Sequence, residues 1–215
     1  MQTVYCISGL GADEGVFQYL DLSFVKPVFI KWITPLQDET LSSYAMRLKQ
    51  KFIHDEKPVI IGLSLGGMIA VEMAKSLPSA KTVIISSAKT VNEIPYYWKM
   101  FQYVPVYKIL PQWSIKRSLG IQQYFLGAYS NVSKQYIIEA LEKADAEFYR
   151  WAIGAILTWQ NQIVPSNIIH IHGINDRILP YKFVKPNISI NKGGHLMIME
   201  NADEISSLIR NIVAN

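Results

Sequence analysis

The sequence predicts an α/β fold, with a doubly wound, mostly parallel sheet of about six strands and a helical cap inserted before the last two strands. Three observations predict it. Short apolar runs recur along the chain, helix-like stretches separate them, and one long aromatic-rich segment interrupts the alternation late in the chain. Alternating strands and helices joined by right-handed crossovers are typical of doubly wound sheets.

Six short runs are the expected strands. They are continuously apolar and rich in β-branched residues, which is typical of strands covered by helices on both faces. Cys6, the only cysteine, lies in the first run, and we expect a buried strand residue there, with a catalytic thiol as the alternative. The runs are Thr3–Ile7, Pro27–Trp32, Pro58–Leu63, Thr82–Ser86, Ile168–Ile171 and Ile188–Ile190.

Three stretches between or after these runs predict the helices of the core. Leu41–His54 carries apolar residues on one face, and Leu65–Ser76 is small and apolar, with Pro78 shortly after its end. In Ala202–Val213 the apolar residues recur at helical spacing.

The alternation stops between Ala88 and Gln162, where a segment rich in Tyr, Trp and Phe reads as helical from about Ser114 onward. Ser133–Lys143, with Ser133 as the expected N-cap, and Asp145–Gln160 have helical spacing. An insertion of this length is too large for a simple crossover. We therefore expect residues 1–88 and 163–215 to form one core domain and residues 89–162 a cap on it.

Composition excludes several classes of protein. At 215 residues, with 50% hydrophobic and 18% charged residues, the chain suits one well-packed globular domain. The net charge of +4 is spread among acidic residues, so we expect no nucleic-acid partner. No apolar run approaches the roughly 20 residues of a membrane span. The N-terminus does not resemble a signal peptide, so the default expectation is a cytoplasmic protein.

The strongest motif is Gly62-Leu-Ser-Leu-Gly-Gly67, which lies where an expected strand turns into an expected helix. Such a turn holds Ser64 in a strained conformation with its hydroxyl above the sheet, next to a helix N-terminus. The amide of Leu65 would then face a developing oxyanion, a contribution of about 3 kcal/mol. The alternative is a glycine-rich turn with a capping serine.

A serine hydroxyl needs a neighbouring base to become a nucleophile. Among the four histidines, His195 follows Lys192-Gly-Gly194 directly after the last expected strand, where a loop freed by two glycines can carry an imidazole over the sheet. We expect His54 to be solvated, His170 to be a core residue and His172 to bond loop backbone. A structural loop histidine is the alternative at position 195.

Asp176 is the expected partner of His195, because it follows a neighbouring strand and could fix the imidazole's tautomer. An ion pair with Arg177 or a turn cap is the alternative. Glu200 and Asp203 are rival acids, but both lie in the closing helix, after His195 in chain order.

The order Ser64, Asp176, His195, together with the segments 62–67, 172–180 and 193–195, resembles the α/β-hydrolase superfamily over nearly the full chain. The resemblance implies a second oxyanion donor, the amide of Leu10 in the turn Ser8-Gly-Leu-Gly11. Ser8 replaces the histidine that usually braces this loop. The resemblance also implies that the usual leading antiparallel strands are absent and that the helix before the last strand is very short or missing.

These features predict a carboxylesterase-like serine hydrolase that acts through an acyl-enzyme, without metal or cofactor. A thioesterase, an amidase, a C–C bond hydrolase or a cofactor-free lyase would use the same residues, and a non-catalytic small-ligand receptor is the alternative of another class. We expect a small substrate with an apolar acyl or aromatic group. The aromatic candidates for binding it are Tyr97, Trp98, Tyr124 and Trp151.

Overall fold

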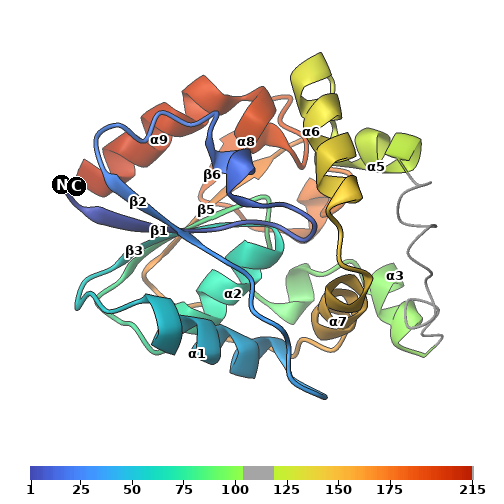
Figure 1. The fold of residues 1–215 in the computed structure, drawn as a ribbon, viewed down its shortest axis with the longest axis horizontal. Helices are drawn as coiled ribbons and strands as arrows, with labels where there is room; N and C mark the ends of the chain where they lie inside the picture. Colours follow the sequence, from blue (N-terminus) through green and yellow to red (C-terminus); the bar gives the residue numbers. More distant parts are fainter. Residues whose placement is uncertain (104–118, 215) are drawn as a thin grey trace.

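A computed structural model describes residues 1–103 and 119–214, and its centre is a six-stranded, entirely parallel sheet in the order β2-β1-β3-β4-β5-β6 (Figure 1). The predicted fold class is confirmed. Each observed strand overlaps a predicted run, with ends shifted by at most two residues. The strands are β1 (Thr3–Ile7), β2 (Lys26–Ile30), β3 (Val59–Leu63), β4 (Lys81–Ile85), β5 (Ile168–Gly173) and β6 (Ile188–Ile190).

The continuous apolarity of the strands is explained by helices on both faces of the sheet. Helices α1 (Leu41–Phe52) and α2 (Leu65–Ala74) cover one face, and α8 (Met197–Glu200) and α9 (Ala202–Ala214) cover the other (Figure 1). Successive strand residues alternate between the two cores, so Tyr5 joins the α1–α2 side and Cys6 the α9 side. Cys6 is 1% exposed, as expected of a strand residue, and burial raises the pKa of its thiol to about 12.

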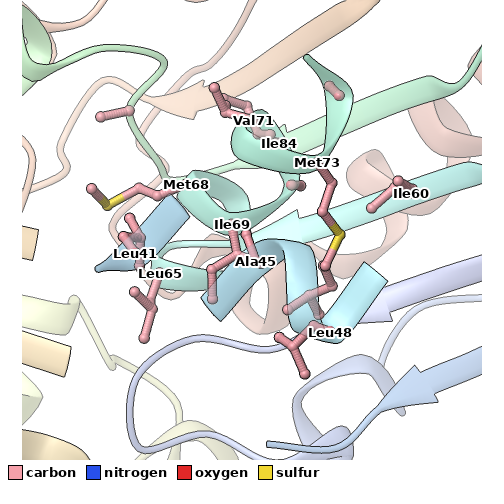
Figure 2. Close-up of a cluster of buried hydrophobic side chains, with 14 of the residues drawn as sticks. Leu41, Ala45, Leu48, Ile60, Leu65, Met68, Ile69, Val71, Met73 and Ile84 are labelled. Atoms are coloured by element: carbon pink, nitrogen blue, oxygen red, sulfur yellow. The ribbon is translucent and has the colours of Figure 1, made fainter. Parts of the chain in front are cut away.

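Helix α2 is buried all round, which its uniformly apolar sequence explains. It packs between α1 and the strands β3 and β4. Figure 2 shows this cluster, which includes Leu41, Ala45 and Leu48 of α1, Ile60 and Ile84 of the strands, and Leu65, Met68, Ile69, Val71 and Met73 of α2. The packing fixes the helix whose first turn follows Ser64.

The helices between β4 and β5 lie together beyond the carboxyl ends of the strands (Figure 1). Within the described residues of this stretch, the α-helices are α3 (Tyr96–Lys99), α5 (Leu119–Leu126), α6 (Asn131–Glu142) and α7 (Ala146–Leu157). The expected helical start near Ser114 lies outside the described residues, and the division into a core and a cap at residues 89 and 162 stays a prediction.

The predicted N-cap of α6 is wrong. Ser130, not Ser133, caps the helix, and its hydroxyl accepts the backbone N–H of Ser133. Both serines are good caps, and the sequence spacing alone does not distinguish them. For α7 the cap is Asp145, which accepts the amides of Glu147 and Phe148.

The strand order reverses between β1 and β3, because the chain first moves from β1 outward to β2 and then returns to the other side of β1. In open parallel sheets, ligands bind beyond the carboxyl ends of the strands at such a reversal. The loops after β1 and β3, which contain Leu10 and Ser64, therefore border the position where a site is expected.

Candidate active site

Ser64 occupies a strained turn between β3 and α2. Its φ of 52° and ψ of −116° lie in a region that side chains other than glycine rarely adopt. The turn is held on both sides, because the Ser64 amide donates to the Ile85 carbonyl at 2.9 Å and the Ser87 hydroxyl donates to the Ser64 carbonyl at 2.7 Å. The hydroxyl of Ser64 is thereby fixed above the carboxyl ends of the strands.

The glycines of the motif allow backbone to approach backbone. A side chain at Gly62 would run into the backbone of Gly66, and one at Gly66 would run into the carbonyls of Ile7 and Ser8. The close approach brings α2 against the loop after β1, and so brings that loop next to Ser64.

Ser64, His195 and Asp176 form one hydrogen-bonded chain. The Ser64 hydroxyl donates to Nε2 of His195 over 2.8 Å, and Nδ1–H of His195 donates to Oδ2 of Asp176, also over 2.8 Å. A carboxylate can only accept, so Asp176 fixes the proton on Nδ1 and leaves Nε2 free to accept from the serine. His195 is 4% and Asp176 4% exposed.

Asp176 is held in place by its other oxygen. Oδ1 accepts the backbone N–H groups of Ile178 and Leu179, each over 2.8 Å. Burial opposes ionisation of this carboxyl, but the charge and hydrogen bond of His195, with further help from His172 and Leu179, hold its pKa below its usual value. Asp176 is therefore the ionised acceptor that His195 needs at neutral pH.

Arg177 does not pair with Asp176, so the ion-pair alternative is wrong. The turn-cap alternative holds for Oδ1 only, because Oδ2 accepts from His195. The guanidinium of Arg177 donates to the Tyr124 carbonyl over 2.7 Å and lies 4.1 Å from the centre of the Tyr124 ring. Glu200, the rival acid, has a different role. Its carboxylate accepts the amides of Tyr129 and Ser130 at 2.9 and 3.0 Å and so ties α8 to the start of α6.

Two buried histidines lie behind the acid. Nε2–H of His172 donates to the Leu179 carbonyl over 2.8 Å and lies 3.4 Å from Oδ2 of Asp176. Its Nδ1 then accepts from Nε2–H of His170 over 3.1 Å. His172 bonds loop backbone and His170 is a core residue, as expected, and burial lowers the pKa of both. Both brace the loop that carries Asp176.

The two glycines before His195 have a different role from the expected one. Neither has a positive φ, and the left-handed residue of this loop is Lys192, with φ 60°. Gly193 instead packs against Gly173, where a side chain would collide with backbone, and Gly194 packs against Gly127. The glycines thus let the histidine loop lie close to the acid loop and to α5, and they do not free it to move.

The backbone amides of Leu10 and Leu65 lie in the two loops beside Ser64, and neither has an acceptor among the described residues. The two loops are close, because a Cβ on Gly9 would lie 3.3 Å from the Ser64 Cβ. Ser8 braces the first loop, with its hydroxyl donating to the Ala12 carbonyl over 2.8 Å. The serine thus supplies a brace where relatives usually have histidine, and the two free amides are suited to hold an oxyanion.

A cavity of about 490 Å³ opens beside Ser64 and His195. Of the four aromatic candidates only Trp98 lines it. Tyr97 packs on Phe183, Tyr124 under Arg177, and the Trp151 indole donates to the Glu39 carbonyl at 2.8 Å, so the structure puts these three outside the cavity.

Most residues that line the cavity were not predicted from the sequence, although the apolar spacing on α7 indicated three of them. Tyr149, Ile153 and Ile156 recur at spacings of four and three, which places them on one helix face, and all three line the cavity. Among the described residues, further apolar side chains line the cavity: Leu10, Leu65, Met68, Ile94, Phe101, Ile121, Phe125, Leu126, Leu157, Ile178 and Leu179.

A sequence profile of the alpha/beta hydrolase family matches residues 4–208. The chain belongs to this family. Comparison with curated proteins gives no match. Within residues 1–103 and 119–214, no helix of this alpha/beta hydrolase has both the length and the apolar character needed to cross a bilayer.

Solved structures share the fold of this alpha/beta hydrolase at low identity. A lipase-esterase related protein from Clostridium acetobutylicum is 19% identical with a TM-score of 0.71, over 98% of this chain and 94% of its own. A hydrolase from Oleispira antarctica (13% identity, TM-score 0.75) and an esterase from Exiguobacterium antarcticum (14%, 0.73) each match 100% of this chain and 92% of their own. At these identities the likeness is one of fold.

Proposed function

We propose that this alpha/beta hydrolase is a serine esterase that cleaves small carboxylic esters through an acyl-enzyme. Ser64 is the nucleophile, and His195 is the general base and acid. Asp176 orients His195 and stabilises its protonated form. The observation that carries the proposal is the unbroken hydrogen-bonded chain from Asp176 through His195 to Ser64, with both bonds at 2.8 Å.

The reaction follows from that chain. Ser64 Oγ attacks the ester carbonyl while its proton moves to Nε2 of His195, and the imidazolium that forms is stabilised by the ionised Asp176. The carbonyl oxygen becomes an oxyanion, to which the amides of Leu65 and Leu10 donate. His195 then gives its proton to the departing alkoxide, which leaves as the alcohol. In the second half, His195 takes a proton from water, and the hydroxide attacks the acyl-enzyme. The bond from the acyl carbon to Ser64 Oγ breaks, His195 returns the proton to Oγ, and the acid is released.

The cavity supports an apolar acyl group as the preferred substrate. Its walls are almost wholly aliphatic and aromatic, and the few polar groups on it include Ser64 and His195 themselves. Burial of an acyl chain there would contribute about 0.8 kcal/mol per methylene. Esterases among the structural neighbours are consistent with this bond type.

A fluorophosphonate probe and a series of ethyl esters test the proposal. We expect the probe to label the wild type and the Ser42→Ala control, which removes an exposed serine on α1, and to leave Ser64→Ala unlabelled. Ester hydrolysis, followed by proton release, should be lost with the label. If the purified protein takes up no probe and hydrolyses no ester, a small-ligand receptor replaces the enzyme as the function of the cavity.

A further inference from the structure

Two cavities of very different size meet at Ser64 and His195. The larger is the apolar cavity of about 490 Å³. The smaller has a volume of about 60 Å³ and lies between the loop after β1 and helix α6. Leu10, Ser64, Tyr149 and His195 line both, so a bond being cleaved at Ser64 would have one cavity available for each of its two sides.

The volume of the small chamber limits what it can hold. At about 60 Å³, against about 490 Å³ for the apolar cavity, it can hold only a short group. Its walls include Ile137 and Leu141 of α6, each 4% exposed, and Leu196, 6% exposed. These side chains belong to the close-packed core, which does not expand readily.

Tyr149 lies between the chamber and a third, polar cavity lined by Asp13, Trp32 and Lys143. Its ring lines all three cavities, and its hydroxyl lies so close to Gly11 that a side chain there would collide with it. Gly11, with φ +75°, is shared between the chamber and the polar cavity. The contact between Tyr149 and Gly11 therefore lies where the chamber and the polar cavity meet.

We propose that the small chamber holds the alcohol side of the ester, a short alkyl group, and that the large cavity holds the acyl chain. This inference rests on the proposed esterase function and adds the substrate class. The acyl group stays bonded to Ser64 after the alcohol has left, so the cavity with more apolar surface stabilises it through both halves of the reaction.

Departure of the alcohol also prepares the second half of the reaction. The alcohol leaves with the proton from His195 and vacates a chamber beside that imidazole, which is larger than the roughly 10–15 Å³ that a water molecule needs. A water molecule there gives a proton to His195 and its oxygen to the acyl carbon, which yields the acid and free Ser64. The chamber thus supplies the nucleophile of deacylation from the side on which the alcohol departed.

Two isomeric esters test the assignment directly. Ethyl octanoate and octyl acetate have the same formula, but the eight-carbon arm lies on the acyl side of one and the alcohol side of the other. We expect ethyl octanoate to have the higher kcat/KM, by about tenfold or more, and butyl octanoate to be about tenfold slower than ethyl octanoate. Equal rates for the two isomers, or faster cleavage of octyl acetate, would overturn the assignment.

Variants of α6 change the chamber while leaving the triad intact. Leu141→Ala enlarges it and should raise the rate on butyl octanoate relative to ethyl octanoate by about tenfold. Ala140→Leu narrows it and should lower the rate on ethyl octanoate relative to methyl octanoate. Val132→Ala, an exposed position on the same helix, is the control and should leave both ratios unchanged.

The ratios do not depend on the amount of folded enzyme, and either chamber variant alone suffices if the other does not fold. Unchanged ratios in a folded variant contradict the inference. Failure of this inference is distinguishable from failure of the proposed function. A wild type that takes up the fluorophosphonate probe but has no preference between the isomers contradicts only the chamber assignment, whereas one that takes up no probe and cleaves no ester contradicts the esterase itself.

Discussion

Replacement of Asp176 by asparagine should abolish activity through the tautomer of His195, because the surroundings of the side chain dictate how an amide would sit. Oδ1 accepts two backbone N–H groups at 2.8 Å, and an NH₂ group there would face two donors. The amide oxygen must therefore take the Oδ1 position, and the NH₂ group must face Nδ1 of His195. Nδ1 then becomes an acceptor, and the proton moves to Nε2.

With Nε2 protonated, His195 can no longer accept the proton of Ser64. We expect kcat/KM of Asp176→Asn to fall by about 10⁴-fold, as for the equivalent change in a serine protease triad, which corresponds to about 5 kcal/mol of transition-state stabilisation. The side chains are nearly isosteric, so the fold should persist.

The assay is kcat/KM on ethyl octanoate, followed by proton release, with thermal unfolding of the same preparation as the control for folding. Asp203→Asn, which changes a rival acid on α9 that lies outside the triad, is the matched variant and should retain wild-type activity. Activity of Asp176→Asn within tenfold of the wild type, in a folded protein, would refute the reasoning.

Three further predictions concern stability. Gly66→Ala drives a methyl group into the Ser8 carbonyl and should lower the free energy of unfolding in urea by about 1–3 kcal/mol; an unchanged midpoint would show that the elbow can relax. Glu200→Ala removes the acceptor for the start of α6 and should cost about 1–3 kcal/mol in the same measurement at pH 7, whereas the exposed Glu142→Ala should cost almost nothing. Burial lowers the pKa of His170, so as pH falls the unfolded chain takes up a proton at this residue before the folded chain does. The folded state therefore loses stability as pH falls below about 6.5, the ordinary histidine pKa. The melting temperature of His170→Gln should change less between pH 7 and 5 than that of the wild type, and an equal change in both proteins would contradict this.

The sheet was predictable because its signal is local. Each strand is visible in the sequence as a short, wholly apolar run, because its residues are buried on both faces of the sheet. Helix ends were less predictable. Ser130 and Ser133 are both suitable caps for α6, and the choice depends on Glu200, 67 residues from Ser133, whose carboxylate binds the start of the helix.

The candidate triad was predictable for a similar reason. A nucleophile elbow needs glycines at fixed spacing around Ser64, and the parallel sheet brings the loops after β3, β5 and β6 to one edge. The cavity was not predictable from the sequence. Its walls are formed by one or a few residues from each of many elements, and only the spacing of Tyr149, Ile153 and Ile156 on α7 indicated a shared face. Trp98 and Trp151 both lie in aromatic-rich segments of the sequence. In the folded chain Trp98 lines the cavity, whereas the Trp151 indole donates to the Glu39 carbonyl.

By itself, the sequence determined the parallel sheet and the three side chains that meet at its edge, because both depend on residue types that backbone geometry requires. Only the tertiary structure decided why Gly193 is a glycine, which cavities Tyr149 lines, and how unequal the two spaces beside Ser64 are. Those properties arise from contacts between segments far apart in the chain, where the free volume left over is set by the packing of all the walls together.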